Sequence, residues 1–382
     1  MKFIGILGST GSVGQQALDI VKEHPEKFKV KFLTCDSNID ELIKQLVLFK
    51  PNYISINKSE AKQKLKQFIN SKNIDCEILS FKDLIHKVKV DIVLNAISGY
   101  QGLEPTIEII KTGTDIALSN KESIVQAGHI IVELAKKYNV NIFPVDSEHS
   151  AIWQCLVGED KNNIKRLILT ASGGPFRKLD KSKFFEVTKK EALNHPNWSM
   201  GDKISIDSAT MMNKGFELIE AYWLFGIDLE KIDIIIHPES LIHSMVEYID
   251  GSIKAQISTP TMKIPIQYAF SYPERFSIDK LDNNLELWRV MNFEGVDLEK
   301  FKCVKLAYKA IKLGGSYPTV LNVSNDIAVD LFLNDKISFE MIPKIIEETM
   351  KKHNYNKNPN LLDIKYLTKW VEDFIPNMVE IL

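Results

Sequence analysis

Two strings in the middle of the chain hold the residues best suited to chemistry, and the first reads PVDSEHS at 144–150. Asp146 and Glu148 are two apart, and in an extended chain such residues face the same side, so their carboxylates can converge on one point. Converging carboxylates repel each other unless a cation or a proton lies between them. Hard oxygen ligands favour Mg²⁺ or Mn²⁺ over zinc. These carboxylates could therefore hold a divalent cation, although a D-x-E string by itself is more often a solvated strand end.

The second string is dense in polar residues and reads HPNWSMG at 195–201 and DSATMMNKGFE at 207–217. Asn213, Lys214 and Glu217 fall at helical spacing, so Asn213 and Glu217 share one helix face. An amide, an ammonium and a carboxylate near one helix start could bind a phosphate and complete a metal site. A capped surface helix would account for the same residues.

A glycine-rich string, GSTGSVG at 8–14, lies between an apolar strand and a helical pattern. Glycines at this position allow a sharp turn, so backbone N–H groups and the helix N-terminus can approach a diphosphate. The string predicts a dinucleotide as the ligand. A glycine turn that only packs the helix on the strand is the alternative.

A fourth string, SNKES at 119–123, follows another apolar strand. Ligands of open α/β sheets bind at the carboxyl ends of the strands. Lys121 is therefore a candidate for a phosphate contact, and Asn120 and Glu122 are candidates for cofactor contacts. A polar cluster that only begins a helix would look the same.

These strings need a scaffold, and the first 150 residues alternate strands with helices. Strands are expected at 3–7, 30–34, 53–56, 90–96, 115–119 and 141–145, with a helix at 124–138. Strands separated by helical segments imply right-handed crossovers and a parallel, doubly wound sheet.

The pattern changes after about residue 150. A strand at 166–170 and a hairpin of strands at 242–248 and 252–257 are expected first. The stretch from about 270 to 300 indicates a linker or loop, and helices are expected at 304–313, 325–333, 339–351 and 364–379. We predict an α/β chain with four parts: a doubly wound, Rossmann-like dinucleotide-binding domain (1–149), an α+β catalytic domain with a dimerisation sheet (150–285), a linker (286–300) and a small C-terminal helical domain (301–382).

Composition restricts the classes of function. The 48 basic and 50 acidic residues give a formal net charge of −2, which does not support binding to nucleic acid by bulk charge. No apolar stretch reaches the length of a membrane span. The four cysteines lie far apart without a CxxC pair, which argues against a disulfide scaffold or a zinc ribbon. A cytoplasmic protein with neither nucleic acid nor membrane as a partner is therefore expected.

Taken together and in order, five strings resemble the 1-deoxy-D-xylulose 5-phosphate reductoisomerase family. They are GSTGSVG at 8–14, NKES at 120–123, PVDSEHSAI at 144–152, TASGGPF at 170–176 and HPNWSMGDKISIDSATMMNKGFE at 195–217, with a weaker match in LNVSNDIAVDLFL at 321–333. The resemblance implies an NADP-dependent oxidoreductase of non-mevalonate isoprenoid biosynthesis. Such enzymes use NADPH and Mg²⁺ or Mn²⁺ to convert 1-deoxy-D-xylulose 5-phosphate, a phosphorylated sugar, into 2-C-methyl-D-erythritol 4-phosphate, and a homodimer is expected.

The resemblance also implies a role for each matching residue. The metal ligands would be Asp146, Glu148 and Glu217, and the catalytic residues would be these three with Lys121 and His195. The residues around the substrate would be Lys121, Ser147, Glu148, Ser172, His195, Trp198, Ser208, Asn213, Lys214 and Glu217, with the phosphate bound by Ser172, Ser208, Asn213 and Lys214. The cofactor contacts would be Thr10, Gly11, Ser12, Val13, Ser37, Asn38, Asn120, Glu122 and Gly201.

A loop that closes over the site is part of the same resemblance. Trp198 and Met200 would lie on it, and a closing loop is a common way to exclude water. His195 belongs to this segment, because the proline after it favours extended backbone. A Trp and a Met that only anchor the loop to the core are the alternative.

One position departs from the family pattern. After the second strand the family usually has a glycine and often a basic residue before the asparagine, whereas this chain reads Cys35-Asp36-Ser37-Asn38. An acidic side chain there is typical of enzymes that bind the free ribose 2′-OH of NAD. Family resemblance still implies NADPH. An ordinary NAD(P)-dependent dehydrogenase without isomerisation and a non-catalytic dinucleotide sensor are the alternative functions.

Overall fold

The computed structural model describes residues 1–198, 200–279, 281 and 283–379. Two compact units make up the chain. The first unit comprises 1–120, 131–147 and 261–281, and the second comprises 121–130, 148–260 and 282–382. The four-part division given above stays a prediction. Among the described residues, no helix is both long enough and apolar enough to cross a bilayer.

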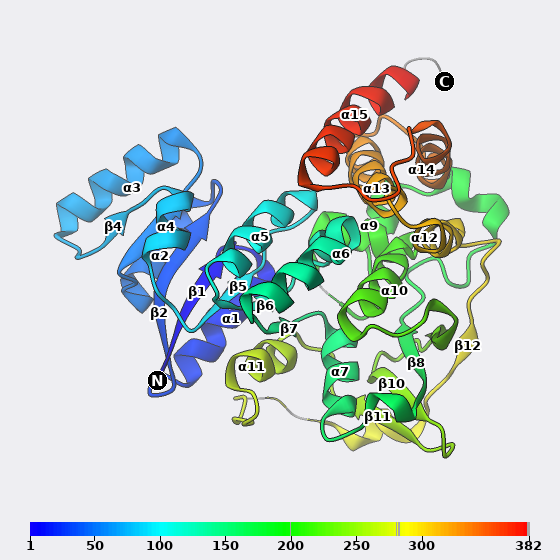
Figure 1. Ribbon diagram of the computed structural model, residues 1–382, viewed down its shortest axis with the longest axis horizontal. Helices are drawn as coiled ribbons and strands as arrows, with labels where there is room; N and C mark the ends of the chain where they lie inside the picture. The colour runs from blue at the N-terminus through cyan, green and yellow to red at the C-terminus, as the bar shows by residue number, and fades with distance from the viewer. Residues whose placement is uncertain (199, 280, 282, 380–382) are drawn as a thin grey trace. The chain divides into compact units, whose positions relative to one another are not determined.

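A parallel sheet forms the centre of the first unit (Figure 1). Its strands are β1 (Lys2–Leu7), β2 (Phe28–Cys35), β3 (Tyr53–Ile56), β4 (Glu77–Ile78), β5 (Ile92–Asn95), β6 (Asp115–Leu118) and β7 (Ile142–Pro144). Among the described residues the order is β4-β3-β2-β1-β5-β6-β7, and every pairing is parallel. The order reverses between β1 and β5, and such a switch point is where doubly wound sheets bind their ligands.

Helices surround this sheet. They are α1 (Ser12–Glu23), α2 (Ile39–Phe49), α3 (Ser59–Lys72), α4 (Phe81–Lys87), α5 (Leu103–Lys111) and, from far along the chain, α11 (Lys263–Ser271). Apolar side chains of α1, α2 and α11 bury themselves in the same core as β1 and β2. Ion pairs fix α11 to α1, because Lys263 Nζ lies 3.0 Å from Glu23 Oε1 and 3.3 Å from Asp19 Oδ2.

A mixed sheet and a group of helices form the second unit. The strands are β8 (Ile164–Ala171), β9 (Ile232–Ile236), β10 (Ile242–Tyr248), β11 (Ile253–Ile257) and β12 (Glu294–Gly295), in the order β11-β10-β8-β9-β12 among described residues. The helices are α7 (Ser147–Leu156), α8 (Lys189–Leu193), α9 (Asp202–Ala209), α10 (Met212–Phe225), α12 (Lys302–Leu313), α13 (Tyr317–Leu333), α14 (Met341–Lys352) and α15 (Leu361–Val379). One further helix, α6 (Lys121–Tyr138), is kinked at Ala127 and contributes its first part to this unit.

The predicted fold class is confirmed, and most predicted strands recur within two residues of their expected ends. The hairpin is also confirmed, with β10 antiparallel to β11. Helix α13 begins at Tyr317, eight residues before its predicted start, because Pro318 is compatible with the first turn of a helix. The extended conformation expected around Glu148 was wrong, since α7 begins at Ser147 and Glu148 is helical. Strand β9 was missed, and so was α11, which ends where the expected loop stretch of about 270–300 begins.

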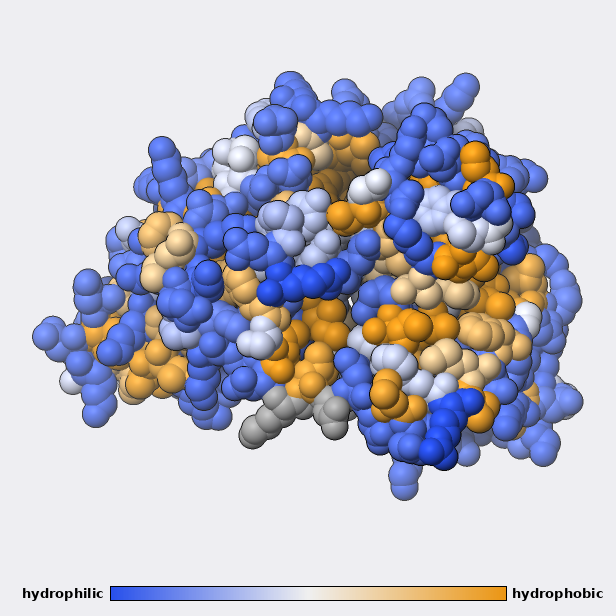
Figure 2. All heavy atoms as spheres, turned by 90° about the horizontal axis from the view of Figure 1, so that it is seen from below, coloured by the Kyte–Doolittle hydropathy of each residue, from blue (hydrophilic) through white to orange (hydrophobic). Residues whose placement is uncertain are grey.

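Apolar side chains reach the surface around the edge of the mixed sheet. Ile249, Ile253 and Ile257 are exposed on the β10–β11 hairpin, and β11 is an edge strand among the described residues. Figure 2 shows patches of apolar side chains between charged ones on one face of the molecule. An exposed edge strand with isoleucines invites pairing with another chain.

Glycine at position 14 is a packing requirement of the first unit. A Cβ on Gly14 would lie 2.4 Å from Gly8 O and 2.6 Å from Ser9 Cα, whereas a Cβ on Gly11 would meet only Gly8 O at 3.4 Å. We expect Gly14→Ala to lower the free energy of unfolding by about 1–3 kcal/mol, because the backbone of the preceding turn must move. Gly11→Ala serves as the matched control and should change it by less than about 0.5 kcal/mol. Urea denaturation checks both, and equal effects of the two substitutions would refute this account.

Candidate functional site

The glycine-rich turn after β1 leaves a helix start open to an anion. Gly8 has φ +75°, and a Cβ there would lie 2.7 Å from Ala96 O, so the turn after β1 touches the end of β5. Helix α1 begins at Ser12 with Gly11 before it, and no side chain caps this start. Its first N–H groups therefore remain for a ligand, and the helix dipole favours a negative one. Thr10, Gly11, Ser12 and Val13, the predicted cofactor contacts, all lie on this turn.

The loop after β2 carries two of the predicted cofactor contacts, Ser37 and Asn38. Asn38 caps α2, because its Oδ1 accepts a hydrogen bond from Glu41 N at 3.3 Å. Asp36 and Ser37 are exposed. The Asp36 carboxylate accepts a hydrogen bond from Asn57 Nδ2 at 3.5 Å, so it faces the loop after β3.

Asn120, another predicted cofactor contact, shapes the loops of the first unit. It is buried, and its Nδ2 donates to Ile97 O at 2.7 Å and to Gly99 O at 2.8 Å. A Cβ on Gly102 would lie within 2.6 Å of the Asn120 amide, so the segment after β5 packs directly on this side chain. Asn120 thus joins the ends of β5 and β6 at the ligand-binding edge of the sheet.

Two lysines and two glutamates form a buried ion-pair cluster in the second unit. Lys121 Nζ lies 3.1 Å from Glu217 Oε1 and donates to Asn213 Oδ1 at 2.9 Å. Lys214 Nζ lies 2.8 Å from Glu148 Oε1 and also pairs with Glu217 Oε2. Asn213 Nδ2 donates to Glu217 Oε1. Five predicted site residues from α6, α7 and α10 therefore come together.

The start of α10 explains why this cluster is buried. Met211 before the helix has the left-handed φ of 58°, and Thr210 Oγ1 accepts a hydrogen bond from Met212 N at 3.3 Å. Gly215 lets α10 pack closely on α12, since a Cβ would lie 2.7 Å from Ala307 Cβ. Lys214 and Glu217 are 4% and 1% exposed, so the alternative of a capped surface helix was wrong.

Lysine side chains, and not only a bound cation, can offset the repulsion expected between the carboxylates. Burial acts to lower the pKa of Lys214, but the charges of Glu148 and Glu217 outweigh it and raise that pKa, so the ammonium is retained. Glu217 has an ammonium at each carboxylate oxygen. The ammonium groups of Lys121 and Lys214 therefore compensate the negative charges of the two glutamates by ion pairing.

The carboxylates suit a divalent cation. Glu148 and Glu217 each offer an oxygen within 4.8 Å of the other. Asp146, the third predicted ligand, is a residue of the first unit and stands two positions before Glu148, so their Cα atoms are at most about 7 Å apart. Carboxylate oxygens are the donors that Mg²⁺ and Mn²⁺ prefer. Ser147, between them, begins α7.

Ser172 and His195 form a hydrogen-bonded pair whose direction can be assigned. Burial lowers the pKa of His195 to about 4, so the ring is neutral at pH 7. Its Nδ1 accepts from Asn197 N at 3.1 Å and Trp198 N at 3.0 Å, which leaves the ring proton on Nε2. Nε2 therefore donates to Ser172 Oγ at 2.9 Å, and Gly174 N donates to the same Ser172 Oγ at 3.2 Å. The Ser172 hydroxyl is then oriented to donate its own proton, as an anion would require.

The loop after β8 approaches α9 closely, which brings Ser172 toward Ser208. Gly174 has φ +67°, and a Cβ there would lie 2.5 Å from Ser208 O. Only glycine fits this approach, so the two predicted phosphate-binding serines lie on adjoining segments. Trp198, on the predicted closing loop, packs its ring edge-on against His243 at 6.4 Å.

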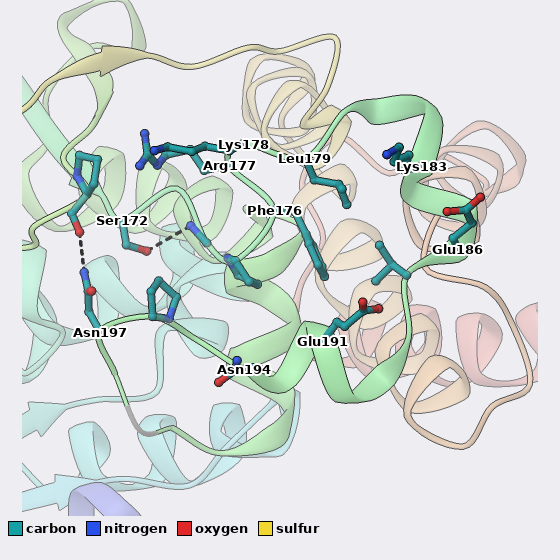
Figure 3. A pocket seen from close by; sticks show the side chains of 15 residues that line it. Ser172, Phe176, Arg177, Lys178, Leu179, Lys183, Glu186, Glu191, Asn194 and Asn197 are labelled. Atoms are coloured by element: carbon teal, nitrogen blue, oxygen red, sulfur yellow. Dashed lines mark hydrogen bonds between the residues drawn. The ribbon is translucent and has the colours of Figure 1, made fainter.

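A pocket of about 850 Å³ opens beside Ser172 (Figure 3). Asn197 lies at its wall and donates from Nδ2 to Pro238 O and to Ser240 Oγ, which ties the segment after His195 to the turn before β10. Arg177, which also lines the pocket, pairs with Glu294. Asn197 and Arg177 were not among the predicted site residues, although Asn197 stands inside the HPNWSM string.

The state of His195 can be tested directly. In NMR titration of the protein we expect the His195 ring to titrate with a midpoint near pH 4, because burial disfavours the imidazolium. As a depressed pKa requires, its contribution to stability is present above pH ~6.5 and is lost as the pH falls toward 4. The ¹⁵N shifts should show the Nε2–H tautomer, and Ser172→Ala should move the Nε2 signal more than the Nδ1 signal. A midpoint above pH 6 would contradict the assignment.

Comparisons with known proteins agree along most of the chain. Three family models match: 1-deoxy-D-xylulose 5-phosphate reductoisomerase at 4–128, its C-terminal domain at 142–225, and a second C-terminal domain of DXP reductoisomerase at 257–374. A 1-deoxy-D-xylulose 5-phosphate reductoisomerase of Thermoanaerobacter pseudethanolicus is 51% identical over 378 residues, with 98% of each chain covered. One of Bacillus subtilis is 46% identical over 385 residues, covering 99% of this chain and all of that protein.

Solved structures give the same result. A DOX-P reductoisomerase in complex with NADPH, fosmidomycin and magnesium superimposes with a TM-score of 0.94 at 38% identity, covering 100% of this chain and 98% of that one. The 1-deoxy-D-xylulose 5-phosphate reductoisomerase of Zymomonas mobilis, in complex with NADPH, gives a TM-score of 0.92 at 37% identity with both chains fully covered. Agreement in sequence and in fold over the whole length shows that this chain belongs to the 1-deoxy-D-xylulose 5-phosphate reductoisomerase family.

Proposed function

We propose that this chain converts 1-deoxy-D-xylulose 5-phosphate into 2-C-methyl-D-erythritol 4-phosphate, with NADPH and Mg²⁺ or Mn²⁺, in non-mevalonate isoprenoid biosynthesis. The observation that carries the proposal is the buried cluster in which Lys121 and Lys214 hold Glu217 and Glu148. Related proteins with solved structures bind NADPH, magnesium and fosmidomycin. The function of an ordinary dehydrogenase or of a dinucleotide sensor would not require this cluster of lysines and glutamates.

The side chains of the second unit divide the work of binding. Ser172 presents an oriented O–H donor, and Ser208 lies on the adjoining segment. Asn213 and Lys214 add an amide and an ammonium at the start of α10, which suits them to the phosphate and to the sugar oxygens. Lys121 sits opposite, 2.9 Å from Asn213 Oδ1, where it can hold a hydroxyl or a developing negative charge.

The metal and cofactor would add what side chains lack. Asp146, Glu148 and Glu217 would hold the cation, and the turn at 8–14 would hold the cofactor diphosphate. When bound, the cation would polarise the ketone as a Lewis acid and NADPH would supply the hydride. Neutral His195 accepts the backbone N–H bonds of its own loop, so it fixes Ser172 and orders the segment that carries Trp198. A loop held in this way can exclude water from the substrate.

A spectrophotometric assay tests the proposal. NADPH should be oxidised only when both 1-deoxy-D-xylulose 5-phosphate and Mg²⁺ or Mn²⁺ are present. Turnover without a divalent cation would favour an ordinary dehydrogenase. Binding of NADPH without any turnover would favour a sensor.

Removal of one carboxylate tests the metal site. Mg²⁺ or Mn²⁺ should raise the melting temperature of the protein through binding to the folded state, and Glu217→Gln should lose this rise. Apparent metal affinity should fall by at least about tenfold, because even neighbours of metal ligands cost 10–100-fold when mutated. Glu299→Gln, at an exposed ion pair with Lys305, is the matched control. Full activity of Glu217→Gln at limiting Mg²⁺ would show that Glu217 is not a ligand.

Cofactor choice depends on Asp36. If the ribose 2′-phosphate lies beside the loop after β2, a carboxylate within ~4 Å disfavours it by about 1 kcal/mol in water-like surroundings. Asp36→Gly should then raise the ratio of kcat/KM for NADPH over NADH by roughly five- to tenfold, since ~1.4 kcal/mol corresponds to a factor of ten. Asp36→Asn keeps the shape and the contact with Asn57, and it should give a similar rise. An unchanged ratio in both variants would mean that the carboxylate faces away from the cofactor.

The assembly and location follow from the same proposal. We expect a homodimer, supported by the exposed isoleucines Ile253 and Ile257 on the edge strand β11. A cytoplasmic location is supported by the widely spaced cysteines, which are free in the structure.

A further inference from the structure

A second buried charge cluster in the second unit includes Glu122, a predicted cofactor contact, but its other three charged residues have no role in the proposed reaction. Lys203 Nζ lies 2.8 Å from Glu122 Oε1, 2.8 Å from Asp207 Oδ2 and 3.0 Å from Asp326 Oδ1. Asn325 Nδ2 donates to the other oxygen of Asp207 at 2.6 Å. One ammonium thus joins three carboxylates, and we call these four charged residues the Lys203 cluster.

Each carboxylate of the Lys203 cluster comes from a different helix. Glu122 belongs to the first turn of α6, Asp207 to α9 and Asp326 to α13. The residue before Glu122 is Lys121, which contacts Asn213 and Glu217. The residue after Asp207 is Ser208, which lies against Gly174 in the loop of Ser172. Two of the three helices therefore carry a predicted substrate contact next to their link with Lys203.

Helix α9 is short and packs against α8, α10 and α13. It spans only Asp202–Ala209, and no side chain caps it after Gly201. Lys203 is its second residue and reaches both α6 and α13, so the link acts at the end of the helix that follows the His195 loop. The ammonium also lies over the Phe216 ring of α10, with Nζ 5.4 Å from the ring centre.

The charges explain why this link is strong. Burial acts to lower the pKa of Lys203, but Asp207, Asp326 and Glu122 outweigh it and raise the pKa well above its ordinary value. Burial acts to raise the pKa of Glu122, yet the charge of Lys203 lowers it on balance. Burial raises the pKa of Asp326 to about 7, with Lys203 opposing and the two other carboxylates adding to the rise. The lysine thus stays charged, and negative charge is in excess around it.

We propose that Lys203 is a positioning residue for the substrate half of the site, which holds the first turn of α6 and the start of α9 against α13 and thereby places Lys121 and Ser208. This inference rests on the proposed function, because the placement matters only if those residues bind the substrate. A merely stabilising ion pair would predict lower stability with unchanged kinetic constants. Positioning predicts altered substrate handling in protein that is still folded.

Kinetics of Lys203→Met test the proposal. The substitution keeps the aliphatic stem and removes the ammonium. We expect the KM for 1-deoxy-D-xylulose 5-phosphate to rise and kcat to fall, with kcat/KM lowered by roughly ten- to hundredfold, because small misplacements of binding groups cost that much. The rise in melting temperature that Mg²⁺ produces should persist, since the metal ligands are untouched.

A double variant separates positioning from stability. Lys203→Met with Asp207→Asn removes one of the carboxylates that lose their ammonium and should recover much of the stability that Lys203→Met loses. Substrate KM should stay raised in the double variant, since the link between α6 and α9 is still absent. If kinetic constants return to those of the unmodified protein together with the stability, Lys203 is only structural and the proposal is overturned. Leu65→Ala, at a buried residue of α3 in the first unit, supplies a control of lowered stability.

A pH series gives a readout that does not depend on turnover. The groups facing Asp326 are Lys203 and Asp207 from α9 and Glu122 from α6, and Cys303 of α12 faces Asp207. Because the pKa of Asp326 is raised on folding, its neutral form stabilises the protein at low pH, and this contribution is lost as the pH rises through about 7. Asp326→Asn should therefore raise the melting temperature more at pH 8 than at pH 5. An equal effect at both pH values would overturn the charge arrangement even if the enzyme is active. Absence of turnover in the unmodified protein would overturn the proposed function and leave the charge arrangement standing.

Discussion

Compensation of buried carboxylates by lysine is the interaction on which the second unit depends. Glu217 is almost fully buried, and an isolated charge there would cost several kcal/mol of desolvation. Lys121 and Lys214 each approach one of its oxygens, so the protein itself supplies positive charge beside the glutamate. The helix α10 can then begin inside the protein with polar residues in its first turn. A dication that enters such a site meets carboxylates already in place.

The first unit offers backbone N–H groups, and not charged side chains, to an anionic ligand. Gly8 and Gly14 bring the turn after β1 so close to the ends of β5 and α1 that a Cβ at either position would meet backbone atoms. What remains at the switch point of the sheet is an uncapped helix start, which attracts phosphate through N–H groups and the helix dipole. Binding of a dinucleotide diphosphate thus needs no lysine or arginine on this turn.

Local patterns predicted the parts of the molecule that are decided locally. The alternation of strands and helices, the hairpin before Ile253 and the glycine turn all follow from short stretches of sequence, and the structure confirms them. The interpretation of Asp146 and Glu148 as extended chain failed because a short polar stretch fits a strand end and a helix start equally well. The Lys203 cluster was missed for another reason. Its partners stand 81 and 123 positions away, and only packing reveals them.

The two clusters have different uses for the same kind of bond, and the first turn of α6 connects them. Lys121 contacts Glu217 in the cluster where two lysines pair with two glutamates. A charged ligand can take the place of one side chain in these pairs. Glu122, the next residue, contacts Lys203, whose single ammonium is the shared partner of three carboxylates. An exchangeable cluster suits binding of a metal and a phosphorylated sugar, whereas the second suits a fixed joint. Lys121 and Glu122 are adjacent and belong one to each cluster, and Ala127 breaks the helical conformation five residues after Glu122. The short first part of α6 therefore connects the candidate site to the Lys203 cluster.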